Sequence, residues 1–76
     1  MIRRMNKNMF VSKMKLFGDS QKSIAEAMNI SLTRVNEKIN ETRGAEFRKR
    51  EIQFLRDRWN LTPEEVDMIF FEKKVS

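Results

Sequence analysis

The sequence contains no cysteine, no histidine and no tyrosine, and each absence narrows the chemistry open to the chain. Without cysteine, neither a disulfide nor a thiolate metal site can form. Without histidine, an enzyme would have to work with carboxylates and lysines, because the commonest general base and metal ligand is missing. No nucleophile–base pair, metal cluster or phosphate loop can be identified in the sequence. We therefore expect no enzyme, no metal site, no cofactor and no small-molecule substrate.

Glycine and proline are also scarce, with two glycines and one proline among 76 residues. No linker or internal repeat is present, and apolar residues never alternate with polar ones over a strand-length run. A chain of this length builds one domain. No apolar run approaches the ~20 residues that span a membrane, and the basic start lacks the core of a signal peptide. These features predict a single all-α domain over residues 1–76, located inside the cell, with residues 1–6 loosely ordered.

The formal net charge of +5 is unevenly distributed. Residues 1–17 carry only basic charges, residues 44–60 carry an excess of basic side chains, and residues 61–76 carry an excess of acidic ones. Positive charge on both sides of a central segment suits a polyanion held along the flanks of an inserted helix. The alternative is a solvated basic surface without a partner.

Residues 20–40 have the pattern of two short helices joined by a tight turn. Ser20 and Ser31 are candidate N-caps, because a serine hydroxyl can accept a hydrogen bond from the first helical turn. Asn29 follows the first helix, and asparagine readily takes the left-handed conformation that ends a helix. Apolar residues recur on one face of each helix, at Ile24, Ala25, Met28, Val35 and Ile39. This order of cap, helix, turn, cap and helix predicts a helix-turn-helix motif.

Three further helices are predicted, over about Lys7–Phe17, over about Lys49–Trp59, and from Thr62 onward. The last has the clearest start, because Thr62, Pro63 and Glu65 together form a capping box with proline at the first helical position. The core residues expected outside the motif are Phe10, Met14, Phe17, Phe47, Ile52, Leu55, Trp59, Val66, Ile69 and Phe70. The sequence thus predicts five helices.

The motif resembles the helix-turn-helix of the Cro and phage-repressor family. The resemblance lies in Gln21, Ile24-Ala25, Met28-Asn29, Ser31, Val35 and Ile39-Asn40, and it extends to the segments FRKREI and LTPEEVDMIFF. The chain departs from the family pattern at Asn29 and at Glu41, where glycine is usual or frequent. The second departure predicts that the recognition helix, about 31–41, runs on toward Arg43 and stops at Gly44.

The resemblance implies a compact five-helix, lambda-repressor-like domain. It further implies a phage-encoded, Cro- or repressor-like regulator of transcription that binds double-stranded DNA sequence-specifically in the cytoplasm of a bacterial host. Family members commonly bind as homodimers, so Met68, Phe71 and Val75 are candidates for a contact between protomers. Alternatively, Phe71 closes the core of the monomer.

In a helix-turn-helix the N-terminal end of the second helix enters the major groove. With Val35 buried, the outward residues are the expected base contacts, Leu32, Thr33, Asn36 and Glu37. Thr33 can bond a base edge or contact a thymine methyl group, and Leu32 offers apolar contact alone. Glu37 can accept from a cytosine amino group or can pair instead with Arg34, three residues earlier.

The expected phosphate contacts are Gln21, Lys22, Ser31, Arg34, Lys38, Asn40 and Arg43. Such contacts supply affinity and salt sensitivity but no choice of sequence. Arg3 and Arg4 either follow the DNA or belong to a terminus that touches nothing. A different class of function also stays open, because exposed Leu32 would suit a protein groove equally well. In that alternative the chain is a helical interaction module, such as an antitoxin or an adaptor.

Overall fold

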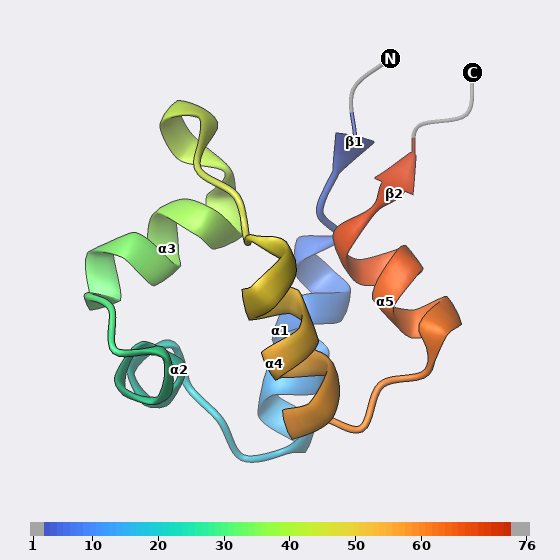
Figure 1. The fold of residues 1–76 in the computed structure, drawn as a ribbon, viewed down its shortest axis with the longest axis horizontal. Coiled ribbons are helices and arrows are strands. Elements are labelled where there is room, and N and C mark those ends of the chain that lie inside the picture. Colours follow the sequence, from blue (N-terminus) through green and yellow to red (C-terminus); the bar gives the residue numbers. More distant parts are fainter. Residues whose placement is uncertain (1–2, 74–76) are drawn as a thin grey trace.

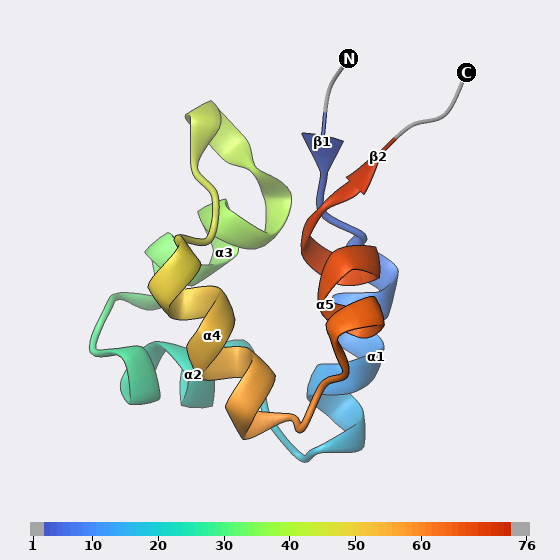
Figure 2. The ribbon, with the colours of Figure 1, turned by 45° about the vertical axis from the view of Figure 1, so that its right-hand side comes forward.

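The computed structural model describes residues 3–73, and the side chains of residues 5–71. Within that range the chain forms five α-helices, a 3-10 turn and a two-residue strand pair. These are β1 (Arg3–Arg4), α1 (Lys7–Leu16), α2 (Gln21–Met28), α3 (Leu32–Asn40), η1 (Thr42–Gly44), α4 (Lys49–Arg58), α5 (Pro63–Phe70) and β2 (Glu72–Lys73). The predicted all-α fold is confirmed. Figures 1 and 2 show α2 and α3 on one side, α1 and α5 together on the other, and α4 between them.

The predicted caps open three of the helices. The Ser20 hydroxyl accepts from the backbone N–H of Ser23 at 3.1 Å, and the Ser23 hydroxyl oxygen accepts from the N–H of Ser20 at 2.9 Å. Thr62 and Glu65 make the same reciprocal pair at the start of α5, at 3.1 and 2.9 Å. Ser31 caps α3. Each cap satisfies a backbone donor that the helix leaves without a partner, so the helix starts follow from local sequence.

An aromatic cluster around Phe10 joins the helices. Its fully buried ring lies 5.1 Å from Trp59, 5.3 Å from Phe47 and 6.0 Å from Phe70, measured between centroids. Each such pair contributes about 0.5–1.5 kcal/mol beyond its buried area. The predicted core residues that are buried are Phe10, Met14, Ile24, Ala25, Val35, Ile39, Phe47, Ile52, Leu55, Trp59, Ile69 and Phe70.

Phe17 does not join this core, contrary to the sequence prediction, and is 45% exposed. The helix α1 ends one residue earlier, at Leu16, and Phe17 takes non-helical dihedral angles. It therefore leaves the apolar stripe that Phe10 and Met14 begin. Met28 and Val66 are partly buried against the core.

The ends of the described chain are held together. The strands β1 and β2 pair antiparallel, with Arg3 opposite Lys73. Next to them, the Asn6 backbone N–H donates to the Ile69 carbonyl at 2.6 Å, and the Asn6 side chain caps α1 by accepting from the N–H of Met9. Residues 3–6, for which the sequence predicts a loosely ordered start, thus form a strand pairing and a helix cap in the structure. Residues 1 and 2 lie outside the described range.

The recognition helix α3 ends at Asn40 and does not run on toward Gly44, so that prediction is wrong. Glu41 adopts the left-handed conformation, with φ 54° and ψ 36°, and closes the helix. Its carboxylate accepts a hydrogen bond from the backbone N–H of Met5 at 3.3 Å. Arg43, in the 3-10 turn that follows, is also left-handed, with φ 55°. Glu41 thus occupies the backbone position that glycine normally fills.

Candidate nucleic-acid interface

The turn between α2 and α3 sets the position of the recognition helix. Asn29 is left-handed as predicted, with φ 59° and ψ 44°. The backbone N–H of Ile30 reaches back to the Ala25 carbonyl at 3.0 Å, which satisfies one of the last carbonyls of α2. Ile24 and Val35, one from each helix, are fully buried. The two helices are therefore fixed by a shared apolar face and by a closed turn.

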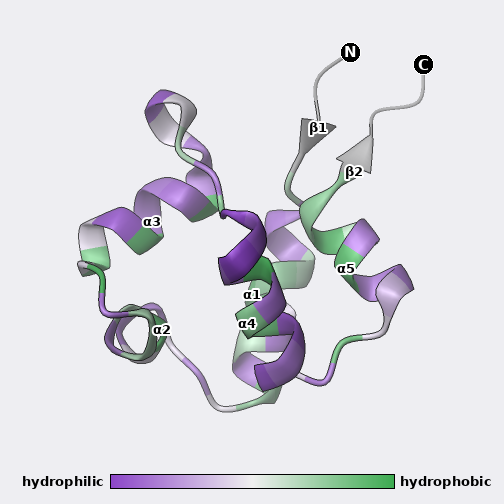
Figure 3. Ribbon diagram, in the orientation of Figure 1, coloured by the Kyte–Doolittle hydropathy of each residue, from purple (hydrophilic) through white to green (hydrophobic). Residues whose placement is uncertain are grey.

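The outer side of α3 is open to solvent. Leu32 is 50% exposed, Thr33 and Asn36 are exposed, and Glu37 is half-buried. At about 100° per residue, these four side chains fall within about 140° of the helix circumference. Figure 3 shows α3 as a mainly hydrophilic helix. The structure thus brings the four expected base contacts onto one accessible side.

Glu37 and Arg34 form an ion pair on this side. The Arg34 Nη1 to Glu37 Oε1 distance is 3.3 Å, with side-chain exposures of 51% and 26%. The pairing that the sequence left open is therefore present in the structure. An ion pair this exposed contributes about 0–1 kcal/mol, so a competing partner can separate the two groups at little expense.

A chain of polar side chains crosses from α2 to α1 over α3. The Asn36 Nδ2 donates to Gln21 Oε1 at 3.4 Å, and the Asn40 Nδ2 donates to the Asn36 carbonyl and Oδ1 at 3.0 and 3.2 Å. Lys7 then donates to Asn40 Oδ1 at 2.6 Å. Sequence reasoning did not assign Lys7 to this surface, although the wholly basic charge of residues 1–17 was the available signal. Its ammonium is hydrogen-bonded to one expected phosphate contact, Asn40.

Lys38 is not part of the interface, which corrects its assignment as a phosphate contact. The residue is 3% exposed, and its Nζ donates to the Glu46 carbonyl and to Glu51 Oε1, both at 3.1 Å. The physical reason is periodicity, since Lys38 lies three residues after buried Val35 and faces inward with it. The Lys38 ammonium is engaged in a buried ion pair and is not accessible to a phosphate.

The other residues that were expected to contact phosphates differ in how far their side chains are exposed to solvent. Lys22, Ser31, Arg34, Asn40 and Arg43 are exposed, and Gln21 is half-buried. The Ser31 hydroxyl is engaged as the cap of α3, where it accepts from the Arg34 N–H at 3.1 Å. Arg43 lies in η1, beyond the C-terminal end of α3 and away from the capped N-terminal end.

Comparison of the chain with protein-family models, with curated proteins and with solved structures finds no match. Among the side chains of residues 5–71, no three histidine, cysteine or carboxylate groups are placed so as to hold a metal ion. Within residues 3–73 no helix has both the length and the apolar character to cross a membrane. The case for a function therefore comes from the geometry of the α2–α3 surface.

Proposed function

We propose that this chain is a sequence-specific double-stranded DNA-binding regulator of transcription, of the Cro and phage-repressor type, whose α3 enters the major groove. One observation carries the proposal: the outer side of α3 is uncovered and carries three polar side chains beside Leu32, while the opposite side is packed into the core through Val35 and Ile39. A helix whose buried face is fixed in the core and whose other face is exposed to solvent can insert into the major groove.

The chemistry of the exposed side chains fits base recognition. Asn36 can bond adenine, and its amide is oriented by hydrogen bonds to Gln21 and Asn40, with one hydrogen and one lone pair still available. Thr33 can bond a base edge, and Leu32 can contact a thymine methyl group. Each well-made base contact of this kind contributes about 1–3 kcal/mol of discrimination.

Binding as a homodimer on two half-sites is part of the proposal. Met68 on α5 is 51% exposed and is available for a contact between protomers. Phe71 is half-buried and packs against the core, as in the alternative that the sequence left open. Val75, the third candidate, lies outside the described residues. The proposal predicts a bound sequence with two-fold symmetry.

Selection of bound duplexes from a random pool, followed by sequencing, tests this function directly. We expect one enriched, two-fold symmetric sequence. Thr33→Ala and Asn36→Ala should change which bases are enriched, because they remove base-edge groups. Lys22→Ala is the matched control, since loss of a phosphate contact should weaken all sites alike and leave the enriched sequence unchanged. A pool without enrichment would overturn the proposal.

The half-exposed side chain of Leu32 favours a second candidate function, in which the chain is a helical protein-docking module of the antitoxin or adaptor kind. An apolar side chain at the start of α3 can enter a protein groove as readily as it can touch a thymine methyl group. The same selection separates the two functions, because a docking module would enrich no duplex. Its affinity for a protein partner would also be unchanged when Lys22 and Arg34 are replaced by alanine.

A further inference from the structure

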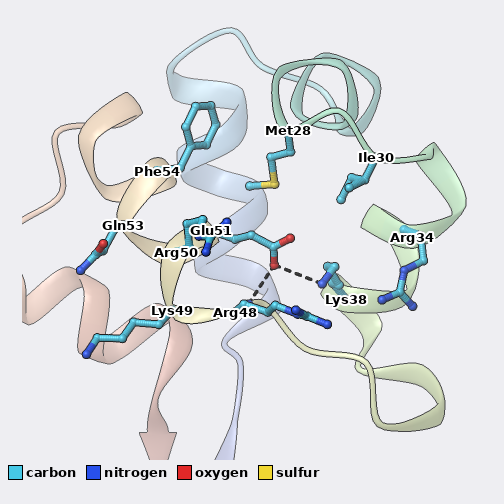
Figure 4. A pocket seen from close by; sticks show the side chains of 10 residues that line it. All are labelled: Met28, Ile30, Arg34, Lys38, Arg48, Lys49, Arg50, Glu51, Gln53 and Phe54. Atoms are coloured by element: carbon cyan, nitrogen blue, oxygen red, sulfur yellow. Dashed lines mark hydrogen bonds and ion pairs between the residues drawn. The ribbon is translucent and has the colours of Figure 1, made fainter.

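A groove of about 880 Å³ opens between the α2–α3 turn and the first half of α4, and we call it the α4 groove. Figure 4 shows it from close by, with side chains from α2, α3 and α4 around it. Of the lining residues only Arg34 belongs to the proposed DNA-contacting set that stays exposed, and none of the four expected base contacts lines the groove. Apart from Arg34, the α4 groove is therefore a surface that the proposed function does not use.

Three apolar side chains line one part of the α4 groove. Met28 and Ile30, at the end of α2 and in the turn, are partly buried against the core, and Phe54 of α4 is 36% exposed. Figure 4 shows the Met28 side chain reaching from α2 toward α4. Methionine is flexible and polarizable, which suits a surface that adapts to apolar side chains of a partner.

The rest of the lining is strongly basic. The cations are Arg34, Lys38, Arg48, Lys49 and Arg50, against the single carboxylate of Glu51. That carboxylate is already engaged, because Glu51 Oε1 accepts from the Lys38 Nζ at 3.1 Å and from the Arg48 backbone N–H at 2.8 Å. Within the part of the chain whose side chains are described, Arg48, Lys49 and Arg50 take part in no ion pair.

The position of these cations adds to the argument. Arg48, Lys49 and Arg50 occupy the cap and first turn of α4, where the partial positive charge of the helix disfavours cations. The folded chain therefore concentrates positive potential at one edge of an apolar depression. A partner that brings carboxylates to this edge would relieve the repulsion and would complement the charge.

We propose that the α4 groove binds an acidic amphipathic peptide segment of a partner protein. Its apolar side chains would lie on Met28, Ile30 and Phe54, and its carboxylates would face Arg48 and Arg50. A nucleic acid fits less well, because a phosphate backbone meets the cations but presents no apolar side chains to the other half of the lining. The proposal does not depend on DNA binding by α3.

Selection from a displayed library of random peptides, with the whole chain as target, tests the inference. We expect enriched peptides that combine aspartate or glutamate with leucine, isoleucine, phenylalanine or methionine. An enriched peptide carrying a fluorescent label should bind Arg48→Glu about tenfold or more weakly than the parent, which corresponds to one reversed charge contact. Phe54→Ala should also weaken binding, because it removes apolar contact area.

The matched control is Arg56→Glu, which makes the same charge change on an exposed residue of α4 that does not line the groove. We expect its affinity for the peptide to stay within about twofold of the parent. Thermal unfolding of each variant establishes that it is folded, and Arg50→Glu replaces Arg48→Glu if the latter is not.

The proposal would be overturned by the absence of an enriched peptide, by enrichment of basic or purely apolar peptides, by equal weakening in Arg56→Glu, or by unchanged affinity in both the charge-reversed variant and Phe54→Ala. A random-sequence duplex provides the last arm. If the duplex, rather than the peptide, shifts the backbone amide resonances of Met28, Ile30 and Phe54, then the groove is a nucleic-acid surface and the peptide proposal is wrong.

Discussion

At the scale of single residues, the buried ammonium of Lys38 has the largest energetic consequences. Taking an ion of this size out of water opposes folding by several kcal/mol. Here the opposition is offset by two oxygens at 3.1 Å, the Glu46 carbonyl and Glu51 Oε1. The two sides of the ion pair are unequal, because removing Glu51 leaves an ammonium whose side chain is 4% exposed, whereas removing Lys38 leaves a carboxylate whose side chain is 18% exposed and still accepts from the Arg48 N–H.

We predict that Glu51→Ala lowers the free energy of unfolding by about 3–5 kcal/mol, as expected for an uncompensated buried ion. Lys38→Met should lower the free energy of unfolding by less than Glu51→Ala does, because the carboxylate that it leaves behind is 18% exposed and keeps its hydrogen bond from the Arg48 N–H. Urea titration measures both values. Asp57→Ala, an exposed change on the same helix, is the control and should alter stability by less than about 0.5 kcal/mol. Equal losses in Lys38→Met and Glu51→Ala would contradict this account.

At the scale of elements, α3 lies between two left-handed residues that are not glycine, Asn29 before it and Glu41 after it. A left-handed L-residue opposes folding by roughly 1–2 kcal/mol, and asparagine tolerates the conformation best. The two ends of the turn connections nearest to α3 are thus set by left-handed residues other than glycine, Asn29 and Glu41. The orientation of α3 therefore depends on how readily Asn29 and Glu41 adopt the left-handed backbone conformation.

We predict that Asn29→Ala lowers the free energy of unfolding by about 1 kcal/mol, since alanine has a Cβ but no polar group to favour the left-handed state. Asn29→Gly should be neutral or stabilising by up to about 1 kcal/mol, because glycine adopts the same φ without strain. Thermal unfolding measures both changes. A glycine variant less stable than the alanine variant would mean that the asparagine side chain, rather than its backbone, holds the turn.

A feature of the fold or of the candidate site could be predicted from the sequence when the residues that determine it are close together in the chain. Ser20, Ser31 and Thr62 were identified as caps because a cap is set by residues three positions away. The end of α3 was placed too late because Glu41 is held partly by the N–H of Met5, 36 residues away. The inward direction of Lys38 was readable from its spacing to Val35, but a charged residue is rarely expected inside. The two-residue strand pair carries no periodic signal at all.

At the scale of the whole molecule, the proposed DNA binding should weaken with salt according to the number of phosphates that basic side chains neutralise. Each phosphate neutralised contributes about −0.9 to the slope of log affinity against log salt concentration. We predict that Lys22→Ala reduces the magnitude of this slope by about 1. Lys38→Met should leave the slope unchanged, because the Lys38 ammonium is buried. Binding titrations over a series of salt concentrations measure the slope, and equal reductions by both variants would contradict the burial of Lys38.

The motif is also joined to the rest of the domain by one carboxylate. Asp19, in the loop between α1 and α2, accepts from Arg58 Nε and Nη2 at 2.8 Å each and from Trp59 Nε1 at 2.7 Å. On its other side it accepts from the Ser23 hydroxyl of α2 at 2.8 Å. These contacts, led by the Arg58 guanidinium, hold the pKa of Asp19 well below its usual range despite partial burial. The end of α4 and the start of the helix-turn-helix thus share one acidic group.

This carboxylate predicts how the whole domain responds to acid. A folded-state pKa below the unfolded value of about 4 stabilises the protein above that pH, and the stabilisation is lost as the pH falls through about 4 and below. We expect the parent to lose stability progressively below about pH 5. Asp19→Asn should be less stable near neutral pH by about 1.5–3 kcal/mol, the usual contribution of hydrogen bonds to a charged group. It should also lose less on acidification, because asparagine has no proton to gain. Denaturant titrations of both proteins from neutral to acid pH measure the two profiles, and parallel profiles would show that Asp19 does not link the domain's stability to pH.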